Sequence, residues 1–298
     1  MMIGYTLGQV ASSFITLFRL LPLVLTNKFS NEPIPTEPQA ESGNVVISLT
    51  THGKRLDVAY FAIESAARGT VKAPIVLWLD EADYYAEWPE TLRRLVRRGL
   101  QVRMSDGGYG PHTKYWNQFR AVHDPERGAT NRVVTIDDDI VYPEWFLERL
   151  LFIANLRDDV VVAYRAHHMQ FRGGELQPYA QWRPADTPRA SYLHFATGVS
   201  GVCYPVSYIN FVVGQGDAFQ QSCPRADDIW LHACALRSGH PVRQVYAKPC
   251  NFAVIPSAQI GGLVLGNALR GGNDAQIAQV YTEEDMRELR ECAAAEGR

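Results

Sequence analysis

Three adjacent aspartates, Asp137, Asp138 and Asp139, follow a run of Val, Ile and Thr that is typical of a buried strand. Like charges at this spacing repel, and burial adds to the cost because each carboxylate loses water. Alternate side chains of a strand point to the same side, so we expect Asp137 and Asp139 to face one way and Asp138 the other. Such an Asp-x-Asp pair can hold Mg²⁺ or Mn²⁺, whose charge would offset the repulsion. The alternative, helix capping, accounts for one aspartate but not three.

A second acidic pair, Asp227 and Asp228, comes directly before the helix predicted from "DDIWLHACALRSG". A carboxylate placed against a sugar hydroxyl can take its proton as the new bond forms. Alone, the pair is better explained as a helix cap with a neighbour favoured by the helix dipole. Together with the aspartates upstream, it favours catalysis, with Asp228 as general base and Asp227 binding the acceptor hydroxyl or orienting Asp228. The reverse assignment, with Asp227 as the base, is also compatible with the sequence.

These carboxylates need a scaffold, and the chain provides alternating apolar runs and amphipathic segments from Asn44 to about Ala166. The predicted strands are "NVVISLT", "PIVLWLD", "LQVRMS", "RVVTI" and "DVVVAYRA", and helices are predicted between them. Repeated β-α units indicate an α/β fold, a mainly parallel sheet with helices on both faces. Ligands bind such sheets at the carboxyl ends of the strands, where Asp137 lies. After Ala166 the periodicity fades, and one more helix is expected after Pro224.

The composition limits the class of protein. The 298 residues are 46% hydrophobic and 20% charged, as in a globular protein with a substantial core. The net charge of -3 gives no indication of nucleic-acid binding. Five cysteines, an odd number without a C-x-x-C pair, argue against a disulfide framework or a structural zinc site. A reducing, cytoplasmic location is the simpler interpretation.

The two ends of the chain differ from the middle. We expect an apolar helix in residues 1–27, a proline-rich linker in 28–43, the main domain in 44–285 and a helical tail in 286–298. The first segment lacks the features of a signal peptide and is too interrupted for a clean membrane span. It fits a helix that lies in a membrane interface, at the inner face of the cytoplasmic membrane, or one that packs on protein. A basic helical face, for which a solvated surface is the default and anionic lipid the alternative, comprises Arg93, Arg94, Arg97 and Arg98.

Nine sequence blocks occur in order between about Val45 and Ile277: "ISLTTHGKRL", "IVLWLDEAD", "YGPHTKYW", "TIDDDIVYPEWF", "YRAHHM", "PYAQW", "TGVSGVCYP", "CPRADDIWLHACAL" and "GGNDAQI". Together they resemble the GT-A-fold glycosyltransferases, and more specifically a bacterial family from surface-polysaccharide gene clusters. The resemblance implies a Rossmann-type sheet, a nucleotide-sugar donor and a glycan or lipid-linked oligosaccharide acceptor. It also implies Mn²⁺ or Mg²⁺ on the donor diphosphate, and inversion at the transferred sugar. The segment "YWNQF" is less aliphatic than in that family.

Further candidates lean on the same resemblance. Without the resemblance, Lys114 would be interpreted as a solvated surface lysine. The aromatic candidates would be interpreted as core residues, and each histidine as a structural residue. The candidates for donor binding are Thr50, Thr51, Arg55, Asp80, Lys114 and Asp138. The candidates for acceptor or sugar binding are Tyr179, Trp182, Gly198 and Gly201, and His167 or His168 is a candidate additional metal ligand.

Two other functions stay open. A nucleotidyltransferase shares the sheet and the carboxylate-metal chemistry, but it should carry a glycine-rich basic loop after the first strand. The segment "SLTTHGKRL" has one glycine and two basic residues, which is a poor match. A non-catalytic sugar-binding or scaffold protein of an assembly complex would not depend on its acidic pairs.

Overall fold

A seven-stranded sheet forms the centre of the computed structural model, which describes residues 19–39, 43–123, 132–256 and 272–297. The strand order is β13-β6-β12-β4-β1-β2-β3, and all neighbours are parallel except those of β12. The strands are β1 (Val45–Thr50), β2 (Ile75–Leu79), β3 (Gln101–Met104), β4 (Arg132–Thr135), β6 (Val161–Ala163), β12 (Val202–Pro205) and β13 (Val242–Gln244). The predicted fold class, a Rossmann-type, mainly parallel α/β sheet flanked by helices, is confirmed.

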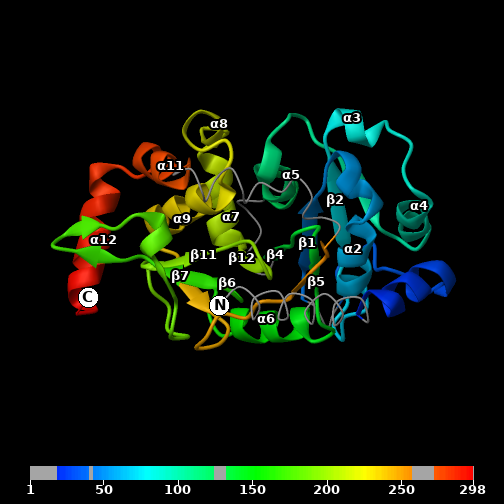
Figure 1. Ribbon diagram of the computed structural model, residues 1–298, viewed down its shortest axis with the longest axis horizontal. Helices are drawn as coiled ribbons and strands as arrows, with labels where there is room; N and C mark the ends of the chain where they lie inside the picture. The colour runs from blue at the N-terminus through cyan, green and yellow to red at the C-terminus, as the bar shows by residue number, and fades with distance from the viewer. Residues whose placement is uncertain (1–18, 40–42, 124–131, 257–271, 298) are drawn as a thin grey trace, which may run out of the picture.

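Helices cover both faces of the sheet (Figure 1). Strand alternation divides the core, since Val134 of β4 faces one hydrophobic cluster and its neighbour Val133 faces the other. The first cluster packs under α2 (Ala59–Ala67), α4 (Glu90–Arg97) and α6 (Phe146–Ala154). The second packs under α5 (Thr113–Val122), α7 (Val206–Gly214), α9 (Asp227–Arg237) and α12 (Glu283–Ala295). The predicted helices that correspond to α2, α4, α5, α6 and α9 are confirmed.

Shorter elements surround this sheet. The helical ones are α3 (Glu81–Tyr84), α8 (Phe219–Ser222), α11 (Gly272–Val280), η1 (Gly53–Asp57), η2 (Gly110–His112) and η3 (Tyr179–Gln181). The strand pairs are β5 (Ile140–Val141) with β14 (Ala253–Val254) and β8 (Phe171–Arg172) with β9 (Glu175–Leu176). A small antiparallel sheet combines β7 (Ala166–His168), β10 (Arg183–Pro184) and β11 (His194–Ala196). The sequence pattern did not predict β12 and α7 in this region, because β12 is four residues long and α7 is rich in β-branched residues.

The described part of the expected linker is docked on the domain. The Ile34 amide donates to the Arg98 carbonyl at 2.6 Å, and the Ile34 side chain is buried in the first core cluster. Gln101 Nε2 donates to the Thr36 carbonyl at 2.8 Å. These contacts hold Ile34 and Thr36 against the domain, and the bounds of the linker stay a prediction. Residues 1–18 and 40–42 of the two N-terminal segments lie outside the described residues.

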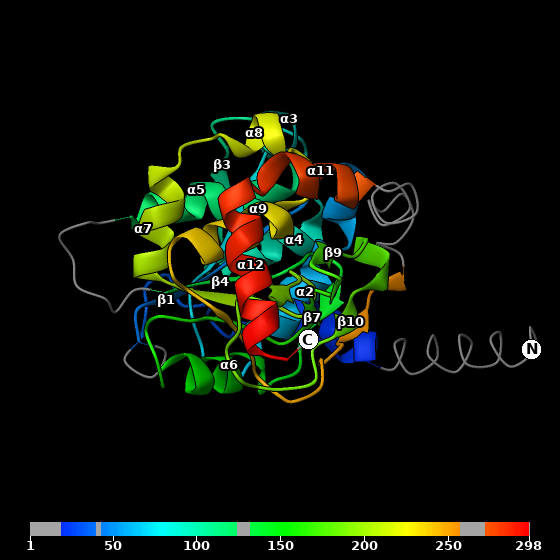
Figure 2. The same cartoon turned by 90° about the vertical axis from the view of Figure 1, so that its left-hand side faces the viewer.

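The expected C-terminal tail is also integrated. Helix α12 begins at Glu283 with a capping box, in which Thr282 and Asp285 bond each other's backbone amides. Arg237 of α9 holds the Asp285 carboxylate at 2.7 Å, and Leu289 is fully buried. Figure 2 shows α12 lying along the side of the molecule that is at the left in Figure 1. Among the described residues, no helix combines the length and apolar character needed to cross a bilayer.

Candidate active site

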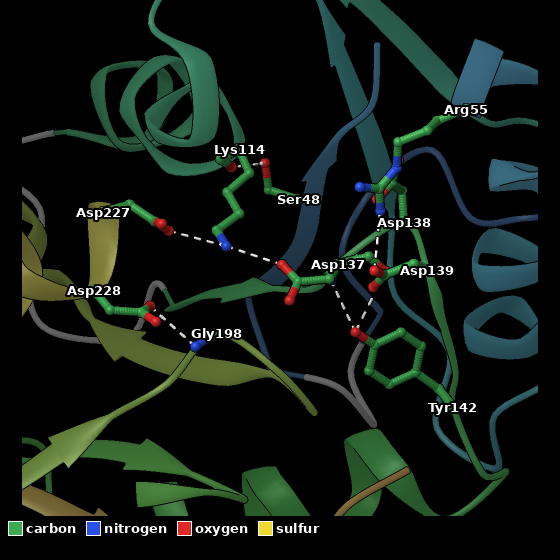
Figure 3. A network of polar contacts seen from close by, with 10 residues as sticks. All are labelled: Ser48, Arg55, Lys114, Asp137, Asp138, Asp139, Tyr142, Gly198, Asp227 and Asp228. Carbon is green, nitrogen blue, oxygen red and sulfur yellow. Dashed lines mark hydrogen bonds and ion pairs between the residues drawn. The ribbon is translucent and has the colours of Figure 1, made fainter. Parts of the chain in front are cut away.

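The three adjacent aspartates lie at the carboxyl end of β4, but in a turn rather than on the strand. The strand ends at Thr135, and Asp137 to Asp139 connect it to β5. Tyr142 is buried, and its Oη accepts the Asp137 amide at 2.8 Å, which fixes the turn. The expected alternation of side chains therefore does not apply: Asp138 and Asp139 contact one cation, and Asp137 contacts another (Figure 3).

Arg55 contacts two of the three carboxylates and offsets one of their two negative charges. Its guanidinium contacts Asp138, and it lies 3.1 Å from Asp139 Oδ2. Thr51 Oγ1 adds a hydrogen bond to Asp138 Oδ2 at 2.5 Å. Burial raises the pKa of Asp138, while Arg55 opposes that rise. Burial and then repulsion by Asp137 raise the pKa of Asp139 to about 6. The protein thus supplies part of the positive charge for which the sequence suggested a metal.

Lys114 joins the two acidic clusters. Its Nζ lies 2.9 Å from Asp137 Oδ1 and 2.9 Å from Asp227 Oδ2, with the side chain only 10% exposed. Ser48 of β1 donates to the Lys114 carbonyl and holds the start of α5 against the sheet. Burial alone would lower the pKa of Lys114, but Asp137, Asp227 and Asp228 together hold it well above the usual value. The solvated-lysine alternative therefore does not hold.

Asp227 and Asp228 occupy the first turn of α9, after the N-cap residue Ala226, and neither caps the helix with its side chain. The Lys114–Asp227 contact is an ion pair without hydrogen-bond geometry, which leaves Asp227 Oδ2 able to accept a donor. Asp228 Oδ1 accepts the Gly198 amide at 3.0 Å. Burial, followed by repulsion from Asp227, raises the pKa of Asp228 to about 8, although Lys114 acts in the opposite direction. A half-buried carboxyl that keeps its proton near neutral pH is a group suited to proton transfer.

Two glycines of the β11–β12 connection have different reasons to be glycine. A Cβ on Gly198 would lie 2.8 Å from Lys114 Nζ and 3.4 Å from Asp228 Oδ1, so the site itself needs the space. Gly201 has a φ of +93°, and a Cβ there would lie 2.6 Å from the Phe146 ring. The geometry brings Gly198 into the site and gives Gly201 a packing role.

The remaining donor candidates lie near the same sheet edge. Thr50 Oγ1 donates to the Trp78 carbonyl at 2.8 Å and links β1 to β2. Asp80 precedes α3, where burial raises its pKa and Asp83 raises it further. The proposed contact of Thr50 and Asp80 with a donor stays a prediction.

The aromatic and histidine candidates divide between two environments. Trp182 is buried and packs on Tyr179 and Phe195 at ring distances of 4.9 and 5.2 Å, which fits the core-packing alternative. Asp228 raises the pKa of Tyr179 beyond the rise caused by burial, which places Tyr179 within electrostatic reach of the candidate base. His168 Nε2 lies 3.1 Å from Glu296, the residue that follows α12, a contact that fits the structural alternative. His167 packs on Tyr179, with ring centroids 5.7 Å apart.

Mn²⁺ or Mg²⁺ fits this site by charge and by donor type. Asp137 and Asp139 are partly exposed oxygen donors, and five aspartates outnumber the two cations Lys114 and Arg55. Within the described residues, no three His, Cys, Asp or Glu side chains are grouped to hold a metal. Magnesium-type sites commonly complete their coordination with water and substrate phosphates, so one or two carboxylates suffice.

Two site residues, Tyr142 and Ser48, were not candidates from the sequence. Both lie within apolar runs, and their roles depend on contacts with Asp137 and Lys114 that no local pattern encodes.

Comparisons with known proteins give similarity in fold alone. No family model matches the chain, and no curated protein matches its sequence. The solved structure of S. aureus TarS, residues 1–349, has a TM-score of 0.45 and 12% identity, over 80% of this chain and 70% of that one. A 4-diphosphocytidyl-2C-methyl-D-erythritol synthase has a TM-score of 0.44 and 13% identity, over 74% of this chain and 99% of that one.

Proposed function

We propose that this protein is a glycosyltransferase that moves a sugar from a nucleotide-sugar to a hydroxyl of a glycan or lipid-linked acceptor in surface-polysaccharide synthesis. The observation that carries the proposal is the meeting of two acidic clusters at Lys114, with the candidate base Asp228 half-buried beside it. The clusters lie about ninety residues apart in sequence and converge at the sheet edge where α/β proteins bind ligands.

The mechanism assigns a role to each side chain. Ionised Asp228 accepts the proton of the acceptor hydroxyl as its oxygen attacks the anomeric carbon. The Gly198 amide keeps Asp228 aimed, and Asp227 Oδ2 accepts a hydrogen bond that orients the acceptor. Lys114 stabilises negative charge between the clusters. The acceptor oxygen attacks from the side opposite the leaving group, so this single displacement inverts the anomeric carbon.

A divalent cation would be held by Asp137 and Asp139 together with the donor diphosphate. When bound, it would stabilise the charge of the departing nucleoside diphosphate. Arg55 and Thr51 hold the neighbouring Asp138, and these protein contacts stabilise the turn.

The nucleotidyltransferase alternative is less well supported. Such an enzyme would use the connection after β1 as a phosphate loop with free amides and free basic groups. Here Arg55 of that connection is engaged by Asp138 and Asp139, and the Gly53 amide donates to Asp83 at 3.0 Å.

The direct test is a screen of nucleotide-sugars for turnover, with and without Mn²⁺, using the wild type and Asp228→Asn. The proposal expects turnover of one donor class by the wild type and almost none by the variant, and NMR of the first product should show an inverted anomeric configuration. Transfer of a nucleotidyl group, or wild-type rates in the variant, would refute it.

A further inference from the structure

The helix at residues 19–29 has two distinct faces. On the inner face, Leu23 is buried, and Asn27 Nδ2 donates to Glu64 Oε1 at 3.0 Å and to the Thr91 carbonyl at 2.9 Å. Glu64 is itself held by Arg98 at 2.6 Å. These buried polar contacts fix the helix to α2 and α4, so its outer face has a defined orientation.

The outer face is apolar and exposed. Leu21, Leu25 and Phe29 follow one another at helical spacing and are 57%, 49% and 67% exposed, and Val24 lies beside them. Val96 of the neighbouring helix α4 is also exposed. Single exposed apolar residues are ordinary, but a row on one helix face indicates a surface that another apolar phase covers.

Positive charge surrounds this row. Residues 19–29 carry Arg19 and Lys28 and no acid, and α4 adds the exposed Arg93 and Arg97 and the half-buried Arg94. Against these five cations stand two carboxylates, Glu87 and Glu90, which pair with the arginines of α4. The whole chain, in contrast, has a net charge of -3. Figure 1 shows the helix, in dark blue, beside α4 at one end of the molecule. The arrangement of apolar row and basic rim matches an anionic bilayer surface rather than a neutral protein partner.

We propose that the helix at 19–29 and α4 form a docking surface for an anionic lipid bilayer, with Leu21, Leu25 and Phe29 in the acyl boundary and the arginines at the headgroups. The surface holds the enzyme on the membrane and does not depend on the proposed glycosyl transfer.

The test is co-sedimentation of the full-length protein with vesicles of phosphatidylcholine alone or with an equal part of phosphatidylserine. The wild type should bind the anionic vesicles and lose that binding as salt rises. The triple variant Leu21→Ser/Leu25→Ser/Phe29→Ser should bind about 10-fold more weakly or worse, because three apolar groups leave the acyl boundary. Its changed side chains are exposed, so a thermal melt should show a folded protein.

Matched variants test each part of the surface. Tyr85→Ser removes an aromatic side chain that is 71% exposed near α3, and it should leave binding unchanged. Arg93→Gln/Arg97→Gln should weaken binding to the anionic vesicles by about 5-fold per arginine, whereas Arg287→Gln on exposed α12 should not.

Three outcomes would overturn the proposal. One is equal vesicle binding by the wild type and the triple variant. Another is binding to phosphatidylcholine alone that equals binding to the anionic vesicles. The third is a lipid-free dimer, seen by sedimentation velocity, that the triple variant abolishes, because a second copy would then cover the face.

Discussion

The cations Arg55 and Lys114 contact different aspartates of the candidate site, and the two groups differ in their pKa values. Arg55 meets Asp138 and Asp139 with hydrogen-bond support from Thr51, so two carboxylates share a guanidinium and a hydroxyl. Lys114 is a single ammonium among Asp137, Asp227 and Asp228. The Arg55 group stabilises a turn, while the Lys114 group contains a carboxyl whose pKa is raised to about 8. A carboxyl whose pKa is raised so strongly marks where protons can move.

The largest expected effect concerns Asp228. Asp228→Asn should lower kcat by about 10² to 10⁴, because the variant keeps the shape but cannot accept a proton. Its Tm should stay equal to that of the wild type or rise, since a buried group with a strongly raised pKa is replaced by a neutral one. Asp227→Asn is the matched control and should mainly raise the acceptor KM. A collapse of rate in Asp227→Asn alone would exchange the two roles.

The two cations can be compared directly by substitution. Lys114→Met and Arg55→Met should each lower stability by about 3 kcal/mol, because each leaves buried carboxylates without a counter-charge. Only Lys114→Met should move the midpoint of the pH–rate profile upward, since Lys114 lowers the pKa of Asp228. Chemical denaturation and initial rates against pH measure both quantities. Identical pH–rate profiles for the two variants would remove the distinction between the Arg55 group and the Lys114 group.

Gly198→Ala tests the space between Lys114 and Asp228. The added Cβ would lie 2.8 Å from Lys114 Nζ and should displace the ammonium, lowering kcat by about 10-fold or more. Gly214→Ala is the control, because a Cβ at Gly214 meets nothing within 4 Å. In a Lys114→Met background, Gly198→Ala should add little, since the group it displaces is gone. Additive losses in the double variant would contradict the proposed contact.

The pH dependence of the wild type has the smallest expected effect. With the Asp228 pKa at about 8, the ionised base is about a tenth of the total at pH 7, so kcat/KM should rise about 10-fold to a plateau above pH 8. The free energy of unfolding should instead fall as the pH rises. A carboxyl whose folded pKa is raised stabilises the fold at low pH, and that contribution is lost as pH rises through 8. Both trends should vanish in Asp228→Asn, and a flat wild-type profile from pH 6 to 9 would contradict the base assignment.

The sequence alone determined the α/β fold class and most helices around the sheet, because hydrophobic periodicity and helix-start signals are local. It also located both acidic clusters. It did not predict β12, which pairs antiparallel between β4 and β6 and so depends on partners elsewhere in the chain. The expected alternation along Asp137 to Asp139 failed because β4 ends at Thr135, and strand ends depend on pairing as well as on sequence.

The pairing of each cation with its carboxylates depends on the tertiary structure. Arg55 and Asp138 lie 83 residues apart, and Lys114 reaches from α5 to Asp137 and to Asp227 on another helix. Such contacts follow from how the helices pack on the sheet. The pKa of the Asp228 carboxyl rises because folding removes water from it and brings Asp137, which is distant in the sequence, close to it.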